Sequence, residues 1–224
     1  MGRETLSFYE TGQIKSLLNN GILEAVDGHR LEVENGFVIW ICGDADQSFP
    51  IFKMSGRICC LKRSDPRLHI IANYGGPTRG DTRHPYNKKF PHAVAALLFE
   101  VASACILKQM STVVLIPHVV CDLETQLGRG LNETLTSAVR AKYTIKANLG
   151  DPRFLDWAIR LLELKAPLSP ELKEFAAALP KAIKVAIFPE LDLGDKLGRQ
   201  LLFLSGAAWS QFIGEDKFQE VHLK

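Results

Sequence analysis

Short, continuous apolar runs that end in polar or glycine-containing loops dominate the hydrophobic pattern of this chain. In chain order, such runs occur at residues 36–42, at residues 68–72, within residues 112–121 and at residues 184–188. Uninterrupted apolar runs of this length are typical of strands that are covered on both faces, as the strands of parallel sheets are. The pattern therefore predicts an α/β fold with a mostly parallel central β-sheet flanked by helices.

Helical spacing of apolar residues fills the intervals between these runs. A helix from Pro91 to Gln109 is expected to connect the second run to the third in a right-handed βαβ unit. Further helices are expected at residues 10–19, 132–143, 151–162, 169–179 and 197–212. We interpret residues 1–224 as a single α/β domain, with an N-terminal helical arm at about residues 1–27 and a helical C-terminal part at about residues 130–224.

Polar segments with turn signals interrupt the pattern in two places. Asn35-Gly36 can join residues 31–33 and 37–39 into a hairpin. Gly75-Gly76 is either a tight turn or a lining of the substrate cleft, because paired glycines allow backbone conformations that are closed to other residues. Residues 78–89 are polar and basic, and we interpret them as an exposed loop.

Two of the apolar runs end in side chains that bind soft metals. Cys42 ends the first run, and His118 and Cys121 follow the third. The C-terminal ends of parallel strands share one edge of a sheet, so these three side chains can converge there. Two thiolates and one imidazole suit Zn²⁺, and they leave a fourth tetrahedral position for water, Asp44 or a substrate.

Composition and charge mainly exclude classes of partner and location for this chain. Lys+Arg number 27 and Asp+Glu 25, interspersed to a net charge of +2, so we expect no nucleic-acid partner. No apolar run reaches the roughly 20 residues that cross a bilayer. Residues 1–20 carry Glu4, Glu10 and Lys15 where a secretion signal would be apolar, so we expect no membrane association and a cytoplasmic location. The five cysteines are then reduced thiols, available to a metal or to the core.

Cys42-Gly43-Asp44 and His118-Val119-Val120-Cys121 together form the pattern Cys-x-Asp, followed far downstream by His-x-x-Cys. In this pattern the chain resembles the β-class carbonic anhydrases. Residues 70–76, Ile-Ile-Ala-Asn-Tyr-Gly-Gly, also look like that family's strand with its Asn- and Gly-containing loop. The resemblance covers roughly residues 37–121. It implies a single zinc-binding domain that assembles as a homodimer or higher homo-oligomer.

The resemblance also implies a site and a reaction. Cys42, His118 and Cys121 look like the zinc ligands, and Asp44 resembles the family's aspartate, which orients the zinc-bound water in open sites and is the fourth ligand in closed sites. The implied reaction is the reversible hydration of CO₂ to bicarbonate by zinc-bound hydroxide. His84 and His92 are conceivable proton shuttles, although no motif singles them out.

The chain departs from the family pattern at a charged position. The family's arginine two residues after the aspartate, which keeps that carboxylate off the metal, is Asp46 here, and the family's glycine after the last ligand is Asp122. A unit charge about 4 Å away is worth on the order of 4 kcal/mol at an effective dielectric near 20. Without another cation, CO₂ hydration is therefore expected to be weak or lost. The candidate replacements are Arg57, Arg63, Arg79 and Arg83.

Three functions of different classes remain open. The first is a zinc enzyme that acts on CO₂ or on another small electrophile. The second is a non-catalytic zinc protein with a closed site made by Cys42, Asp44, His118 and Cys121. The third is a metal-free thiol enzyme, with Cys42 as nucleophile and His118 as base, for which the sequence offers no nucleophile elbow or redox motif. The remaining cysteines, Cys59, Cys60 and Cys105, are expected to pack in the core.

Overall fold

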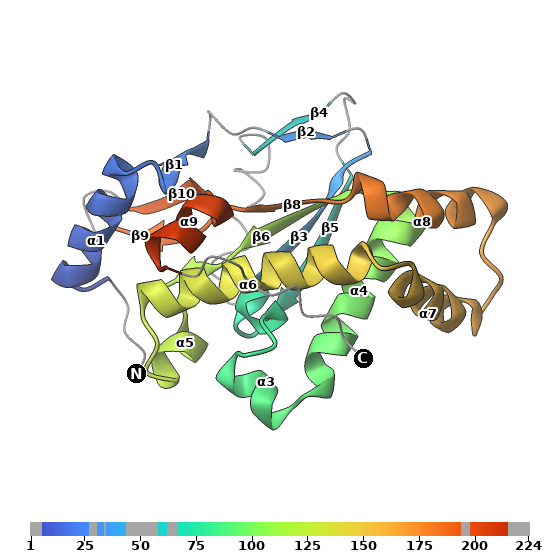
Figure 1. Ribbon diagram of the computed structural model, residues 1–224, viewed down its shortest axis with the longest axis horizontal. Coiled ribbons are helices and arrows are strands. Elements are labelled where there is room, and N and C mark those ends of the chain that lie inside the picture. The colour runs from blue at the N-terminus through green and yellow to red at the C-terminus, as the bar shows by residue number, and fades with distance from the viewer. Residues whose placement is uncertain are drawn as a thin grey trace.

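A computed structural model describes residues 6–26, 31–33, 35–43, 58–61, 67–193 and 198–214. Its centre is a sheet of parallel strands, which run across the middle of the molecule in Figure 1. In the described part of the chain the strand order is β5-β3-β6-β8, formed by β3 (Phe37–Cys42), β5 (Leu68–Asn73), β6 (Thr112–Ile116) and β8 (Lys184–Ile187). These strands coincide with the four predicted apolar runs, and every pair is parallel. The α/β prediction is confirmed.

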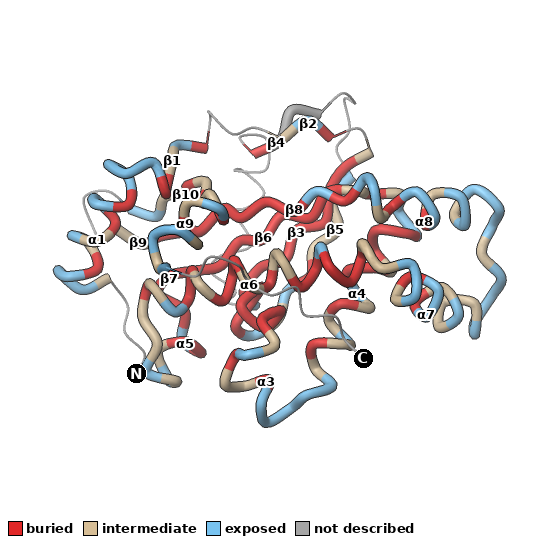
Figure 2. Tube along the Cα trace, viewed as in Figure 1, coloured by how far each residue is buried: buried red, intermediate tan, exposed pale blue. Residues whose placement is uncertain are grey.

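The two faces of this sheet bury different side chains of the same strands. Val38 and Trp40 point into the larger core, where they meet the helices, whereas Phe37, Ile39 and Ile41 belong to a second cluster on the opposite face. All of them are at most 2% exposed, and Figure 2 shows the central strands buried along their length. Burial on both faces is the reason why these strands are continuously apolar rather than alternating.

The helices that pack on the larger core were mostly predicted. They are α1 (Phe8–Asn19), α4 (His92–Lys108), α6 (Leu131–Leu149), α7 (Pro152–Glu163) and α8 (Pro170–Ala182). Asp151 and Ser169 cap α7 and α8, each followed by proline at the first helical position. The start of α6 is capped by Gly130 rather than by Asn132. Figure 1 shows α6 lying across the sheet, with α4, α7 and α8 at one end.

A second sheet lies at the other end of the molecule, next to α1 (Figure 1). Its strand order is β1-β10-β9-β7 among the described residues, with β1 (Leu23–Ala25), β7 (His118–Val119), β9 (Glu190–Asp192) and β10 (Arg199–Leu204). The expected helix at residues 197–212 is therefore wrong for its first half, and only α9 (Gly206–Phe212) is helical. The apolar run in β10 fits either structure locally, and pairing with β1 and β9 decides for strand.

The predicted hairpin at Asn35-Gly36 is also wrong. Strand β2 (Leu31–Val33) pairs in parallel with β4 (Cys59–Leu61), and β3 pairs with β5 and β6. Gly36 has a φ of +108°, and a Cβ there would lie 1.9 Å from the carbonyl oxygen of Arg67. The glycine thus serves a close approach of two backbones instead of a two-residue turn.

The segment after β5 is folded into the protein rather than exposed. It forms the 3₁₀-helix η3 (Gly76–Gly80) and the short helix α3 (Pro85–Lys89), and a further short helix, α5 (Asp122–Gln126), follows β7. All five residues of η3 are buried. The expectation of an exposed loop at residues 78–89 is thus wrong for its first part, although Lys88 and Lys89 are exposed. None of the helices in the described residues is long and apolar enough to cross a membrane.

Candidate metal centre

The C-terminal ends of β3 and β6 mark the point at which the order of the central sheet reverses. From β3 the chain continues to β5 on one side, and the next strand of the sheet, β6, lies on the other side of β3. Ligands of open α/β sheets bind outside the carboxyl ends of the strands at such a switch point. Cys42 is the last residue of β3, and His118 and Cys121 follow β6 within five positions.

The two predicted sulfur ligands lie side by side at this switch point. Cys42 Sγ is 3.7 Å from Cys121 Sγ, and the two residues are 1% and 3% exposed. Leu123, Tyr86 and Leu127 pack around the pair. Two sulfurs bound to one tetrahedral zinc at 2.3 Å would lie about 3.8 Å apart. The spacing of the pair therefore fits a shared zinc ion.

Cys121 is held by the first turn of α5. It is the N-cap of this helix, with extended backbone angles. The hydrogen bond with Cys42 and burial raise the pKa of the Cys121 thiol well above its usual range, whereas the backbone N–H groups of Glu124 and Leu123 act in the opposite direction. Two thiolates at this distance are costly without a cation. A soft divalent ion would remove that cost, since coordinated thiols are deprotonated.

Gly76 lies against the backbone of Cys42, and Gly75 lies against Leu123. Gly76 has a φ of +56°, and a Cβ on it would be 2.6 Å from the backbone nitrogen of Cys42. Gly75 has a φ of +88°, and its Cβ would be 2.4 Å from Cδ2 of Leu123. The two glycines thus form a tight turn that also lies beside the candidate site, because their missing side chains let this turn contact both Cys42 and Leu123. Substrate binding by the two glycines stays a prediction.

His118 does not join the sulfur pair. No group of three His, Cys, Asp or Glu side chains that could hold a metal occurs among the described residues. His118 is buried in β7, where its strand partner is Glu190. Burial and the charge of Arg199 lower the pKa of His118 to about 4. The imidazole is therefore neutral at pH 7, which is the form that binds metals. The role of His118 as a zinc ligand stays a prediction.

Several of the predicted site residues lie outside the described residues. Asp44 is one of them, and so are Asp46, Arg57 and Arg63. Residues 49–54, a largely apolar segment of the sequence, lie outside the described residues too. The fourth metal position and the effect of Asp46 thus stay predictions from the sequence.

Arg79 is the candidate replacement cation that the structure places next to the site. It is 7% exposed, and its guanidinium carbon lies 3.5 Å from the centroid of the Tyr86 ring, which packs against the cluster of Cys42, Cys121 and Leu123. Its Nε donates to Asn87 Oδ1 at 3.3 Å and its Nη1 to the carbonyl of Tyr74 at 3.4 Å. Burial lowers the pKa of Arg79, but a guanidinium stays charged at neutral pH. Arg83, by contrast, is exposed.

A buried polar cluster beneath the site was not foreseen from the sequence. Its centre is the carboxylate of Glu124, which is 1% exposed and accepts hydrogen bonds from Thr78, His84 and Arg129. Burial alone would raise the pKa of Glu124. Hydrogen bonds from His84 and Thr78 and the charge of Arg129 outweigh it and lower the pKa, so the carboxylate is ionised at neutral pH.

His84, one of the two conceivable proton shuttles, is a member of this cluster. It is fully buried, its Nδ1 accepts the backbone N–H of Tyr86 at 3.2 Å, and its Nε2 lies 2.9 Å from Glu124 Oε1. Both ring nitrogens are therefore engaged, with the proton on Nε2. This position does not suit a shuttle to solvent. His92 is exposed at the start of α4.

Comparisons with known proteins add little to this geometry. No family model matches the sequence, and no curated protein matches it either. Among solved structures, the chain is similar to a carbonic anhydrase from Streptococcus mutans, with a TM-score of 0.35 and 15% sequence identity, over 90% of this chain and 99% of that one. Similarity at this level carries no argument about function, which therefore has to be argued from the residues themselves.

Proposed function

We propose that this protein binds zinc through Cys42 and Cys121, and that it is a divergent relative of the β-class carbonic anhydrases. The observation that carries the proposal is the sulfur spacing of 3.7 Å at the topological switch point. His118 is proposed as the third ligand, because it precedes Cys121 by three positions and completes the Cys-x-Asp and His-x-x-Cys pattern. Its side chain would have to turn toward the sulfurs, and Asp44 or water would fill the fourth position.

The proposed reaction is the hydration of CO₂ to bicarbonate. A zinc ion in this place would supply a Lewis acid that brings the pKa of a bound water toward neutrality. The chain's own residues would provide the rest of the site. Leu123 and Tyr86 form an apolar wall beside the sulfurs, and the backbone of Gly75 and Gly76 leaves no side chain between η3 and Cys42. Arg79, stacked on Tyr86, would supply positive charge for an anionic product.

Asp46 favours weak catalysis over full catalysis. Replacing the family's arginine by aspartate removes one positive charge and adds one negative charge two residues after Asp44, which lowers the net charge there by two units. The same change releases Asp44 to bind the metal, which favours the second candidate, a closed Cys₂-His-Asp site without activity. The positive charge of Arg79 would offset part of the charge change and so favour activity.

Zinc content tests the ligands. We expect the full-length protein, purified without chelator, to contain one zinc per chain by elemental mass spectrometry, and Cys42→Ser or Cys121→Ser to lose it. His118→Ala should weaken zinc retention. Cys105→Ala is the matched control, since Cys105 is buried in α4 away from the pair. A wild-type protein that neither contains zinc nor becomes more thermostable when zinc is added contradicts the proposal.

Stopped-flow CO₂ hydration between pH 7 and 9 tests the reaction. We expect weak activity at neutral pH in the wild type, an increase in Asp46→Arg, and a smaller increase in Asp46→Asn, which removes only the negative charge. Arg79→Gln should lower what activity there is. Full activity in the unmodified protein would overturn the charge argument. Zinc binding without activity in any of the variants would favour the closed, non-catalytic site.

The resemblance also leads us to propose a homo-oligomer. Strand β5 is an edge of the central sheet in the described part of the chain. Light scattering of the purified protein tests this proposal, and a monomer at micromolar concentration would contradict it.

A further inference from the structure

Glu124 connects the two segments that hold the two cysteines. It is the third residue of α5, the helix that begins directly after Cys121. Its Oε1 lies 2.7 Å from the hydroxyl of Thr78, which is part of η3, the segment packed against Cys42. The carboxylate of Glu124 thus connects α5, which follows Cys121, with η3, which packs against Cys42.

The Thr78 hydroxyl extends this connection to the glycine pair. Thr78 Oγ1 is 2.7 Å from Glu124 Oε1 and also 2.7 Å from the carbonyl oxygen of Gly75. Its single proton can be donated to one of these acceptors at a time. Either bond holds η3 in the conformation in which Gly76 touches the Cys42 backbone.

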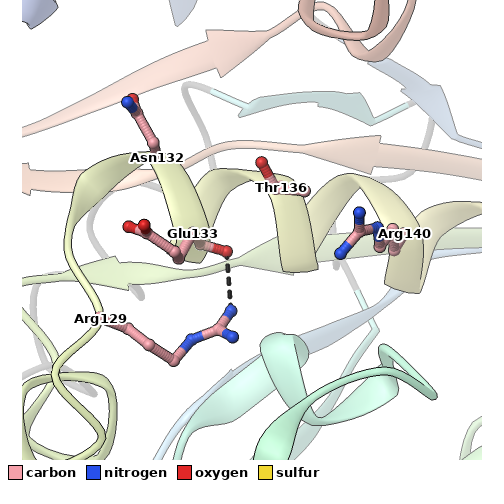
Figure 3. Close-up of a pocket in the computed structure, with 5 residues that line it drawn as sticks. All are labelled: Arg129, Asn132, Glu133, Thr136 and Arg140. Carbon is pink, nitrogen blue, oxygen red and sulfur yellow. Dashed lines mark hydrogen bonds between the residues drawn. The ribbon is translucent and has the colours of Figure 1, made fainter. Parts of the chain in front are cut away.

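Two further donors fix the carboxylate itself. His84 donates from Nε2 to Oε1 at 2.9 Å, and Arg129 donates from Nε to Oε2 at 2.5 Å. Arg129 is in turn anchored to α6, because its Nη2 donates to Ser137 Oγ at 2.6 Å and to the carbonyl of Glu133 at 2.9 Å. Figure 3 shows the bond from Arg129 to the carbonyl of Glu133 at the start of α6. Both residues line a pocket of about 250 Å³.

We propose that Glu124 is the positioning residue of the cysteine pair: by tying η3 to the first turn of α5, its carboxylate sets the Sγ–Sγ distance at which the two thiols share one soft ion. The inference rests on the proposed zinc function for its purpose. Glu124 does not touch the ion in this assignment. It acts on Cys121 through α5, which begins at the residue after Cys121 and carries Glu124 in its first turn, and on Cys42 through Thr78 and η3.

The substitutions separate the hydrogen bonds from the bulk of the side chain. Glu124→Ala removes every bond of the carboxylate. Glu124→Gln has the same shape and keeps an oxygen for Thr78 and His84, but its amide nitrogen cannot accept from Arg129. Thr78→Val removes the connection to η3 alone. Glu10→Ala is the matched control, because Glu10 is also a buried glutamate (6% exposed), accepts the N–H of Leu131 at the start of α6, and is distant from both cysteines in the sequence.

Two readouts report on the sulfurs without any enzymatic activity. The first is the ultraviolet charge-transfer absorption of Cd²⁺ bound to thiolates, titrated in competition with a chelator. The second is the reaction of the metal-free protein with phenylarsine oxide, a trivalent arsenical that captures two thiols only when they lie close together. We expect Glu124→Ala to weaken Cd²⁺ binding about 10- to 100-fold, as losses of supporting residues do in metal sites. Capture by the arsenical should slow as well.

The variants should rank by the bonds they keep. Glu124→Gln and Thr78→Val should lie between Glu124→Ala and the wild type in both readouts, and Glu10→Ala should match the wild type in both even if it lowers Tm as much. If Glu124→Ala fails to fold, the Gln and Val variants decide. Wild-type behaviour of every folded Glu124 variant, or an equal loss in Glu10→Ala, overturns the inference.

The two proposals fail separately. If the wild type binds neither zinc nor Cd²⁺, yet its capture by phenylarsine oxide depends on Glu124 as expected, the zinc function fails and the positioning role stands. If zinc binds but no Glu124 variant changes either readout, the positioning role fails and the zinc function stands.

Discussion

The backbone of Gly76 touches the backbone of Cys42, and Gly76→Ala measures what that contact requires. Gly76 has a φ of +56°, and an added Cβ would lie 2.6 Å from the nitrogen and 2.9 Å from the Cα of Cys42. A non-glycine residue in the left-handed region costs roughly 1–2 kcal/mol, and the stiffer unfolded chain returns about 0.4–1 kcal/mol of that. Relieving the overlap with rigid backbone adds about 1–3 kcal/mol. The expected loss of unfolding free energy is about 1–5 kcal/mol, of which about 1–3 kcal/mol comes from the overlap with Cys42.

Gly21→Ala is the matched control for the backbone conformation. Gly21 has a φ of +65°, is exposed, and has no atom within 4 Å of the position that a Cβ would take. It should therefore lose only the conformational part, about 1 kcal/mol. Urea unfolding followed by tryptophan fluorescence gives both values, with m unchanged if the unfolded state is the same. Equal losses in the two variants would refute the close approach of η3 to Cys42.

The remaining predictions concern other parts of the structure. Burial raises the pKa of Glu190 to about 7, from 4.5, and neither of its carboxylate oxygens has a hydrogen-bond partner in the described residues. Because the folded protein holds this proton more tightly, stability should fall as pH rises from about 4.5 to about 7, by about 3 kcal/mol in total. Glu190→Gln should remove this loss, giving a gain at pH 8 and none at pH 4 in urea titrations with chelator present, and an equal change at both pH values would contradict it. Ser169→Ala should cost about 1 kcal/mol in thermal unfolding, because Ser169 Oγ accepts the N–H of Leu172 at the start of α8. Burial raises the pKa of Cys105 to about 12, so Cys105→Ala should leave the number of thiols that react with a disulfide reagent in the native protein at pH 8 unchanged.

The predicted elements that the structure confirms are those whose evidence is local. The strands β3 and β6 are continuously buried, β5 and β8 are largely apolar, and the starts of α7 and α8 carry a capping residue followed by proline. Where two structures fit the same local pattern, the prediction was wrong. The run in β10 is apolar enough for a helix, and only its antiparallel partners β1 and β9 make it a strand.

Part of the candidate site could likewise be predicted from local sequence, and part could not. The meeting of Cys42 and Cys121 could be predicted, because parallel strands bring their C-terminal ends to one edge. Glu124 and its partners could not. A glutamate in the first turn of a helix is ordinary on an exposed surface, and nothing near it in the sequence indicates that Thr78, 46 positions away, and His84 will bury it.

By itself, the sequence determined the class of fold, the strand ends that carry the sulfurs and the chemistry that those sulfurs favour, since each of these follows from periodicity or from residue type. Only the tertiary structure decided that η3 is buried against Cys42, that Arg79 stacks on Tyr86, and that His118 lies beside Glu190 rather than beside the sulfurs. The physical reason is that burial and hydrogen bonding of polar side chains depend on partners that are distant in the chain, and these come together only when the sheet and its helices pack.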